Sequence, residues 1–435
     1  MEAYPWKSIT GMSSYSPVES QTKILVRCCH NLLPDELWVE IMSRLPVKSL
    51  LDCKCVQKSW CHLINTLIHD QRFVTKHLKN SGDRPSLSIL YSCDVFSREF
   101  KGSFVTICSN ENDDDGKIDH MDTIIEDFDL SFFRQHYRVS FPGCHCNGII
   151  CISGHPENNN VLLCNPALRE FKLITSSCFA PSMGRNRKRL LGFGHDEVDN
   201  VYKVVRMFYK NGDLLGAEVH TLGVDHRNSW RRINIEAEEL WTDCNRLMYQ
   251  ELQCKRIIYW LASGYCPVYR RIVSFDVHDE KFQLISLPAL DDNFAATTET
   301  CFQVRYKLAL WNELVALFEF YLPRCRCGKR WTCFSPKPIE MWILDVSLTG
   351  SGHTSYSWTK HLTIPPLGQI YHPVVFWKND ELILMSYSYS TDCPGKDSAS
   401  SYNLSTQKVR SLHKIPETLE IISSFTYVQS LVSIS

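Results

Sequence analysis

Residues 32–64 read LLPDELWVEIMSRLPVKSLLDCKCVQKSWCHLI, and this stretch decides the organisation of the chain. Leu33 and Pro34 open a first helix, because a proline in the first turn lacks only an amide hydrogen that the helix would leave unbonded. Apolar side chains then recur at helical spacing and form one wide stripe. The stripe consists of Leu37, Trp38, Ile41, Met42 and Leu45. Pro46 ends this helix, since the residue before a proline is pushed out of the helical region.

Two more short helices are predicted in the same stretch. The second runs through residues 48–51, and the third carries the apolar residues Cys55, Val56, Trp60, Leu63 and Ile64. Helices of this length cannot bury so many apolar groups among themselves, so another surface must cover part of the stripe. Either the rest of the chain covers it, or a partner protein receives a helical hairpin in a groove. Periodicity alone does not decide between the two.

The order of these residues resembles an F-box, the module that docks substrate receptors onto the Skp-type adaptor of SCF (Skp–cullin–F-box) ubiquitin ligases. The match runs through Leu33-Pro34, Leu37, Ile41, Leu45-Pro46, Lys48-Ser49-Leu50, Cys55-Val56, Lys58-Ser59-Trp60 and Leu63-Ile64. Asp52 and Cys53 depart from the pattern, since related sequences usually carry a basic or aromatic residue there. The resemblance implies that the adaptor contacts Leu33, Pro34, Leu37, Ile41, Leu45, Pro46, Leu50 and Val56.

Composition limits the kind of protein. With 435 residues, of which 44% are hydrophobic, the chain can bury a large core and is expected to form two to three domains. The formal net charge of −1 argues against binding to nucleic acid or to a membrane surface, which would need a basic face. The 20 cysteines are scattered through a long chain without a signal peptide, so we expect reduced thiols in the cytoplasm or nucleus.

Three segments are predicted along the chain. Residues 1–31 are polar and serine-rich and are expected to be a disordered leader. Residues 32–80 hold the F-box and a following helix that leaves it. From residue 81 to residue 435 the pattern changes to short β-branched or aromatic runs bounded by turn residues, which predicts strands. The predicted fold class is therefore α+β and multidomain: a small all-α F-box of three helices, followed by a large all-β domain.

The all-β domain also repeats. Asn or Asp, followed a few residues later by an aromatic or apolar residue, recurs five times. The copies are Asn165…Phe171, Asp225…Trp230, Asp276…Phe282, Asp345…Trp358 and Asn403…Val409. A period near ~50 residues with four strands in each copy predicts a kelch-like β-propeller. A two-sheet sandwich is the weaker alternative, because it would not need equal repeats.

Several segments of this domain resemble the plant F-box-associated domain, among them HCNGIICI, VLLCNPALREFKLI and IVSFDVHDEKFQLISLP. The combination of CNGII, LLCNPALREF, SWTKHLTI and SFTYVQSLVSI is most similar to the S-locus F-box group, the pollen-side receptors of gametophytic self-incompatibility. The resemblance implies a non-catalytic subunit that binds the Skp-type adaptor, and through it the cullin, and holds a target protein for ubiquitination. In the S-locus group the targets are secreted style ribonucleases, which are usually basic.

Motifs for catalysis or cofactor binding are absent from the sequence, which has no GxSxG, HExxH or P-loop pattern. Residues 192–197, GFGHDE, precede a strand rather than a helix, so we interpret them as a turn and not as a phosphate site. Cys144 and Cys146 are one residue apart, as are Cys325 and Cys327, whereas zinc pairs are typically two to four apart. We therefore predict packed thiols and a basic loop rather than a metal site.

Two charged runs lie in predicted loops, where recognition residues concentrate. Asp113, Asp114 and Asp115 would steer a basic target by electrostatic attraction, while the basic run at residues 185–189 would repel it. The alternative is that both are solvated loops. A different function also stays open, namely a propeller that binds a small ligand or sugar, or an enzyme without a ubiquitin role. The sequence, however, offers no cluster of inward-pointing carboxylates or histidines at matching blade positions, as a ligand site in a central channel would need.

Overall fold

The computed structural model describes residues 34–81, 86–93, 99–108, 120–128, 144–153, 160–175, 177–179, 187–210, 213–223, 230–235, 247–263, 270–288, 302–323, 336–348, 354–367, 371–378, 380–386, 399–412 and 420–434. The chain divides into two compact units, Met1–Asn80 and Ser81–Ser435. The predicted leader at residues 1–31, Leu33 and the acidic run Asp113, Asp114 and Asp115 all lie outside the described residues.

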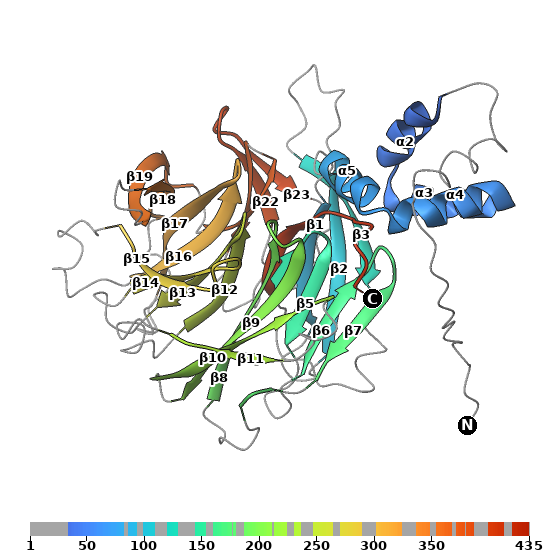
Figure 1. Cartoon of the computed structure of the whole chain (residues 1–435). Helices are drawn as coiled ribbons and strands as arrows, with labels where there is room; N and C mark the ends of the chain where they lie inside the picture. Colours follow the sequence, from blue (N-terminus) through green and yellow to red (C-terminus); the bar gives the residue numbers. More distant parts are fainter. Residues whose placement is uncertain are drawn as a thin grey trace. The chain divides into compact units, whose positions relative to one another are not determined.

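The first unit is helical. Its elements are α2 (Asp35–Ser43), α3 (Val47–Asp52), the 3₁₀ turn η2 (Cys53–Cys55), α4 (Lys58–His69) and α5 (Gln71–Ser81) (Figure 1). As predicted, α2 begins after Pro34 and ends ahead of Pro46, and α3 follows Pro46 at once. The described part of the unit has four α-helices, of which α5 is the predicted following helix; it does not leave the F-box but packs back onto it.

Helix α5 completes the core of the helical unit. Phe73, Val74 and His77 of α5 are buried, and His77 Nε2 lies 2.9 Å from the Leu45 carbonyl oxygen at the end of α2. The buried apolar residues of the other helices are Met42, Val47, Leu50, Ile64 and Leu67. The rest of the chain thus supplies part of the cover that the apolar stripe needs.

The second unit consists of β-sheets. The four-stranded sheets within the described residues are built from β4 (Cys144–Cys146), β5 (Ile149–Ser153), β6 (Val161–Asn165) and β7 (Glu170–Ile174); β8 (Arg187–Asp196), β9 (Val201–Lys210), β10 (Asp213–Thr221) and β11 (Arg231–Ile233); β12 (Leu247–Cys254), β13 (Ile257–Ser263), β14 (Arg270–Asp276) and β15 (Phe282–Ser286); and β16 (Phe302–Trp311), β17 (Leu314–Pro323), β18 (Ile339–Leu348) and β19 (Thr354–Ile364).

An eight-stranded sheet, ordered β20-β21-β22-β23-β3-β2-β1-β24, completes the second unit. Its strands are β1 (Ser86–Cys93), β2 (Glu99–Cys108), β3 (His120–Phe128), β20 (Tyr371–Lys378), β21 (Glu381–Ser386), β22 (Ala399–Asn403), β23 (Val409–Leu412) and β24 (Glu420–Tyr427). It contains two antiparallel groups of four strands, joined by the parallel pairing of β23 with β3. Counted by hydrogen-bonded sheets, the described strands form five blades.

The sheets surround a common centre (Figure 1). Edge strands are neighbours there: β4, β8, β12, β16 and β20 each lie next to an edge strand of another sheet, and β24 lies next to β20, the opposite edge of its own sheet. A separate hydrophobic core fills the space between successive sheets: one joins β8–β11 to β12–β15, a second joins β12–β15 to β16–β19, and a third joins β16–β19 to β20–β23. This arrangement confirms the predicted β-propeller.

The predicted repeat occupies the same position in each blade that contains a copy of it. Each copy spans the connection from the third to the fourth strand, as from β6 to β7 and from β22 to β23. In the best-defined copies the Asn or Asp side-chain oxygen accepts amide hydrogen bonds from residues two or three positions on. The residue four positions on has a positive φ, which is 57° at Arg169, 54° at Glu280 and 58° at Gln407. The side chain therefore fixes a tight turn that reverses the chain within the sheet.

The segment after β24 closes the ring onto β4–β7. Asn165 Nδ2 donates hydrogen bonds to the carbonyl oxygens of Ser430 and Val432, at 3.1 and 2.7 Å. Ser430 is fully buried, and Gly148 leaves room for it, since a Cβ at Gly148 would lie 2.6 Å from the Ser430 Cβ. The first complete sheet of the propeller is thus fastened by the last described residues of the chain.

Candidate functional site

The helical unit leaves large apolar side chains in water. Leu37 is 48% exposed, Ile41 is 42% exposed, and Val56, just after η2, is 67% exposed. Leu37 and Ile41 are four positions apart in α2 and therefore lie on the same face of that helix. The opposite face of α2 carries Met42, which is buried at 1% exposure. The face with Leu37 and Ile41 is therefore apolar although it lies outside the buried core of the unit.

The residues predicted to meet the adaptor divide into surface and interior. Pro34 and Pro46 are exposed, as are Leu37, Ile41 and Val56. Leu45 is partly buried. Leu50 has no exposed surface, because it packs within the core of the helical unit. Leu50 therefore offers no surface to a partner in this structure. Trp60 is partly buried and packs edge-on against Trp38, with ring centroids 5.7 Å apart.

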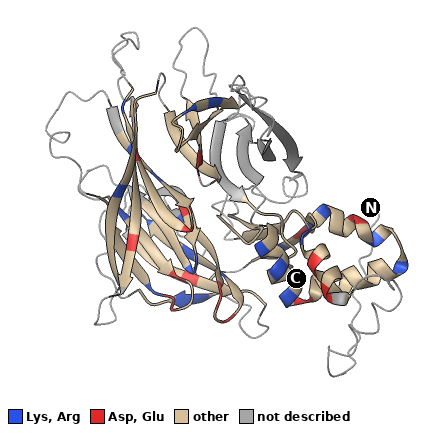
Figure 2. Cartoon of the chain, turned by 90° about the horizontal axis from the view of Figure 1, so that it is seen from above, with Lys and Arg blue, Asp and Glu red and all other residues tan. Residues whose placement is uncertain are grey.

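Charged side chains hold α2 against α5. The Glu40 carboxylate of α2 pairs with Arg44 one turn later and with Lys76 of α5. Hydrogen bonds from Lys76 and Arg44 lower the pKa of Glu40 below its ordinary value. Figure 2 shows both basic and acidic residues along the helices of this unit. Of the two pairs, the one between Glu40 and Lys76 links α2 to α5.

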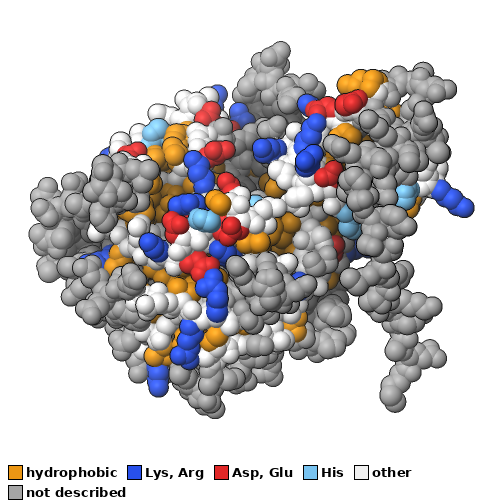
Figure 3. All heavy atoms as spheres, in the orientation of Figure 1, with side chains coloured by type: hydrophobic (Ala, Val, Ile, Leu, Met, Phe, Trp, Pro, Cys, Tyr) orange, Lys and Arg blue, Asp and Glu red, His pale blue; other side chains and the backbone are white. Residues whose placement is uncertain are grey.

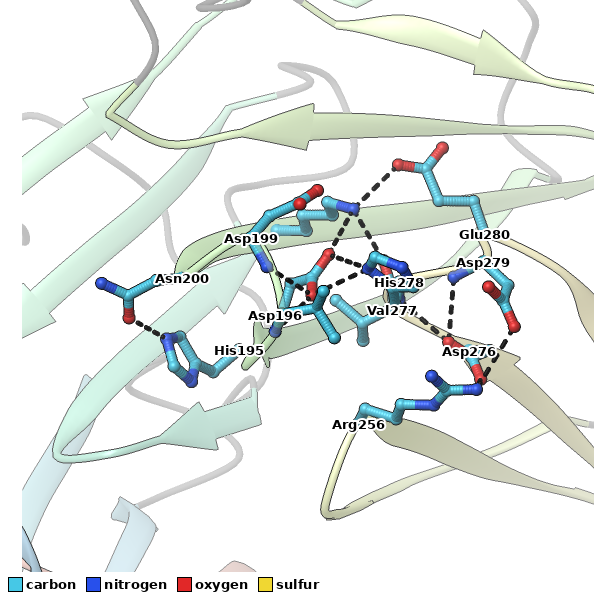
Figure 4. A network of polar contacts seen from close by, with 12 residues as sticks. His195, Asp196, Asp199, Asn200, Arg256, Asp276, Val277, His278, Asp279 and Glu280 are labelled. Atoms are coloured by element: carbon cyan, nitrogen blue, oxygen red, sulfur yellow. Dashed lines mark hydrogen bonds and ion pairs between the residues drawn. The ribbon is translucent and has the colours of Figure 1, made fainter.

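A polar network joins two neighbouring blades of the propeller (Figure 4). Lys203 of β9 reaches three acceptors with its ammonium group: Asp196 Oδ2 at 3.0 Å, the Val277 carbonyl oxygen at 2.8 Å and Glu280 Oε1 at 3.1 Å. His278 Nδ1 lies 3.1 Å from the same Asp196 carboxylate. Asp196 is the last residue of β8, whereas Val277 and Glu280 come directly after β14. The network therefore fastens the sheet β8–β11 to the sheet β12–β15.

Asp196 is charged at neutral pH although it is fully buried. Burial by itself would raise the pKa of this carboxyl group, but hydrogen bonds from Lys203, from the Asp199 amide and from His278 outweigh that effect. They hold the pKa of Asp196 at about 2. In the view of Figure 3, acidic, basic and histidine side chains lie close together on the surface over the middle of the propeller.

The same cluster has donors that suit a metal ion, and the fit can be tested on the geometry. Asp196, Asp199 and His278 each offer one ligand atom, and these atoms lie within 4.8 Å of one another. The three N–H donors of Lys203 already face three acceptors, which is the full capacity of an ammonium group. A metal ion here would share the Asp196 carboxylate with the positive Lys203 ammonium group and would be repelled by it. We therefore assign the cluster to an internal lysine and not to a metal.

The sequence motifs singled out earlier take structural positions. Cys144 and Cys146 are buried in β4, and burial raises the pKa of the Cys146 thiol to about 12, so it stays protonated and packs as an apolar group. Residues 192–196 form the end of strand β8 and only residue 197 begins the turn after it, so the interpretation of the whole run as a turn was wrong. Cys325, Cys327 and Cys333 lie outside the described residues. Sequence reasoning missed the lysine network, although Asp196 has the same capping role as the Asn and Asp of the repeat.

Two family models match the chain. One, described as an F-box associated beta propeller domain, covers residues 94–413, and the other, described as F-box-like, covers residues 30–73. The chain belongs to this family of F-box proteins. Proteins with these two domains are generally non-catalytic adaptors of ubiquitin ligases, and an F-box implies binding to a Skp-type adaptor.

Relatives of this F-box protein come from Arabidopsis thaliana. One F-box protein is 24% identical over 356 residues, which are 75% of this chain and 76% of the relative. An F-box/LRR-repeat protein is 25% identical over 282 residues, which are 59% of this chain and 56% of the relative. The chain thus spans little more than half of that second protein. Among solved structures, an oligogalacturonate lyase in complex with manganese is 7% identical, with a TM-score of 0.36 over 75% of this chain and 77% of the lyase chain.

Of the helices that the structure describes, none is long and apolar enough to cross a bilayer.

Proposed function

We propose that this F-box protein is the substrate-recognition subunit of an SCF-type ubiquitin ligase in the cytoplasm or nucleus. Its helical unit docks onto the Skp-type adaptor, and through it onto the cullin, while the propeller holds a target protein. The receptor contributes no catalytic group, because an E2 enzyme recruited elsewhere in the complex transfers ubiquitin. Its contribution is proximity, which raises the effective concentration of the target's lysines near the E2.

The exposure of Leu37 and Ile41 carries this proposal. A helix with a complete core beneath it gains nothing from leaving two large apolar side chains in water, unless a partner covers them. The predicted docking residues Pro34, Pro46 and Val56 are exposed as well. Leu33 and Leu45 remain proposed contacts, whereas Leu50 supports the surface from below.

The docking surface is tested by charge substitution in the full chain. Leu37→Asp and Ile41→Asp place a carboxylate where the partner would have to desolvate it, so we expect each to weaken binding to a purified Skp-type adaptor by about tenfold or more. Val198→Asp is the matched control, because Val198 is 66% exposed but lies in a propeller turn. Binding is measured by co-purification and by titration calorimetry. Equal binding of all three variants and the wild type would place the docking surface elsewhere.

The target is proposed from the resemblance to the S-locus group. We infer that the target is a basic secreted ribonuclease, which the acidic residues Asp113, Asp114 and Asp115 would steer toward the propeller. These residues lie outside the described residues, so the support is the sequence resemblance together with their charge.

Steering predicts a particular kinetic result. Replacing Asp113, Asp114 and Asp115 together by Asn should slow the association with a basic style ribonuclease at low salt. The difference should shrink as salt rises, because screening removes the long-range attraction. Surface plasmon resonance at several salt concentrations measures the association rates. Equal association rates in dilute buffer would remove this run as the steering surface while leaving adaptor docking untouched.

A further inference from the structure

Basic side chains gather on two inner strands of the propeller. Arg305 and Lys307 stand two positions apart in β16 and therefore share one face of that strand. His372 lies in β20, the inner strand of the next blade along the chain. All three residues are partly exposed, although the inner strands are enclosed by the sheets around them.

Ring contacts show which way these side chains face. Phe320 is the cross-strand partner of Arg305, and its ring centroid lies 6.3 Å from that of His372. Phe318 is the partner of Lys307, and its ring lies 5.7 Å from that of Phe376 in β20. Directly paired residues in an antiparallel sheet share one face. Arg305 and Lys307 thus lie on the face of β16–β19 that meets the sheet β20–β23.

Lys307 meets no counter-charge among the residues that the structure describes. It makes no hydrogen bond or ion pair with any residue that the structure describes, and burial lowers the pKa of its ammonium group to about 8. Glu319, the acidic residue of β17 nearest to it in register, pairs with Tyr306 and so lies on the opposite face. Burial, and next the charge of Lys307, lower the pKa of His372 to about 3. The ammonium and the imidazole are therefore near each other, and neither pKa is raised by a described carboxylate.

The same propeller shows how lysines are otherwise accommodated. Lys203 is nearly buried and has two carboxylates and a carbonyl oxygen around it. Lys360 lies on the outer strand β19 and pairs with Glu340 at 2.7 Å. An enclosed charge without a partner is costly, and proteins compensate it with a counter-ion or lose the charge. Lys307 is the exception among these three, because no residue that the structure describes accepts a hydrogen bond from its three donors.

We propose that Lys307, with Arg305 and His372 beside it, binds the oxyanion group of a small molecule at the inner edges of the sheets β16–β19 and β20–β23. A phosphate or a carboxylate supplies the missing acceptors and the missing negative charge. The ligand touches two successive blades, so its binding stabilises the propeller against their separation. The site lies in the all-β unit and does not depend on the ubiquitin role.

The test uses the full chain and two probes, inorganic phosphate for the phosphate class and citrate for the carboxylate class. Titration calorimetry and thermal unfolding are followed against sodium chloride at matched ionic strength. We expect a saturable heat and a rise in melting temperature with at least one probe in the wild type. Lys307→Met should weaken that binding by about tenfold or more, and Lys307→Arg should retain it. Lys360→Met, which removes an exposed and paired lysine, should bind as the wild type does.

Several results would overturn the site. They are the absence of a saturable response to either probe, and equal binding by the wild type and Lys307→Met, which would indicate an adventitious ion only. Lys307→Met should fold, because it removes an uncompensated charge while keeping the length of the side chain. If it does not, His372→Gln provides the second comparison. Wild-type affinity in a folded His372→Gln protein would then contradict the proposed site.

Discussion

Leu50 and Leu37 are chemically identical, but they serve the helical unit in different ways. Leu50 has no exposed surface, whereas Leu37 is 48% exposed. Removing side-chain atoms from Leu50 leaves a cavity in a small core, while the same change at Leu37 removes atoms that already face water. Stability and docking should therefore separate cleanly between these two residues.

Leu50→Ala should lower the free energy of unfolding of the helical unit by about 2–5 kcal/mol, the range for a buried leucine. Leu37→Ala should change it by less than about 0.5 kcal/mol. Urea unfolding followed by circular dichroism at the helix band measures this unit, since the α-helices that the structure describes all lie in it. Adaptor binding should show the opposite order. When both variants are folded, Leu37→Ala should bind the adaptor more weakly than Leu50→Ala. Equal losses of stability would mean that α2 is not arranged as described.

At the scale of the elements, one local rule builds the propeller turns. An Asn or Asp side chain accepts the amides of the turn, and the residue four positions later takes a positive φ. Asn165, Asp276 and Asn403 do so between third and fourth strands, and Asp196 does so between a first and a second strand. The first three stand at a regular period and were predicted from the sequence. Asp196 stands outside that period and was not.

Strand periodicity predicted the existence of the blades but not the meaning of their polar positions. In β16 the residues Arg305 and Lys307 alternate with the apolar Val304, Tyr306 and Leu308, a pattern that is typical of a strand with one face in water. In a propeller both faces of a sheet are covered by neighbouring blades. The polar positions of an inner strand therefore point into the molecule, and only the assembled ring shows that no described carboxylate pairs with Lys307.

At the scale of the whole molecule, buried histidines make stability depend on pH. Burial, followed by the charges of Lys172 and Arg206, lowers the pKa of His220 to about 4, and the pKa of His372 is about 3. In the unfolded chain a histidine titrates near ~6.5. Below that pH the unfolded chain binds protons that the folded propeller refuses, so stability is complete above about pH 6.5 and falls as the pH decreases.

Thermal unfolding between pH 7.5 and 5, above the range in which most carboxylates titrate, measures this effect. The wild-type melting temperature should fall steadily across the interval, and His220→Gln should reduce the slope. His62→Gln is the control, because His62 is exposed on α4 of the helical unit. A slope that is unchanged in His220→Gln would show that this histidine takes up its proton in the folded state.

The hydrogen bonds of Asn165 to Ser430 and Val432 join residues 265 and 267 positions apart. Contacts this distant in sequence form late, because the whole intervening chain must be present before they can close. On the ribosome, residues 34–81 can complete their helices through local contacts while the ring of sheets is still open, since synthesis presents the chain from its amino end. The growing chain therefore passes through a stage in which the helices for the adaptor are folded but the part that holds the target is not. Assembly of the ligase can begin on a receptor that is still being made.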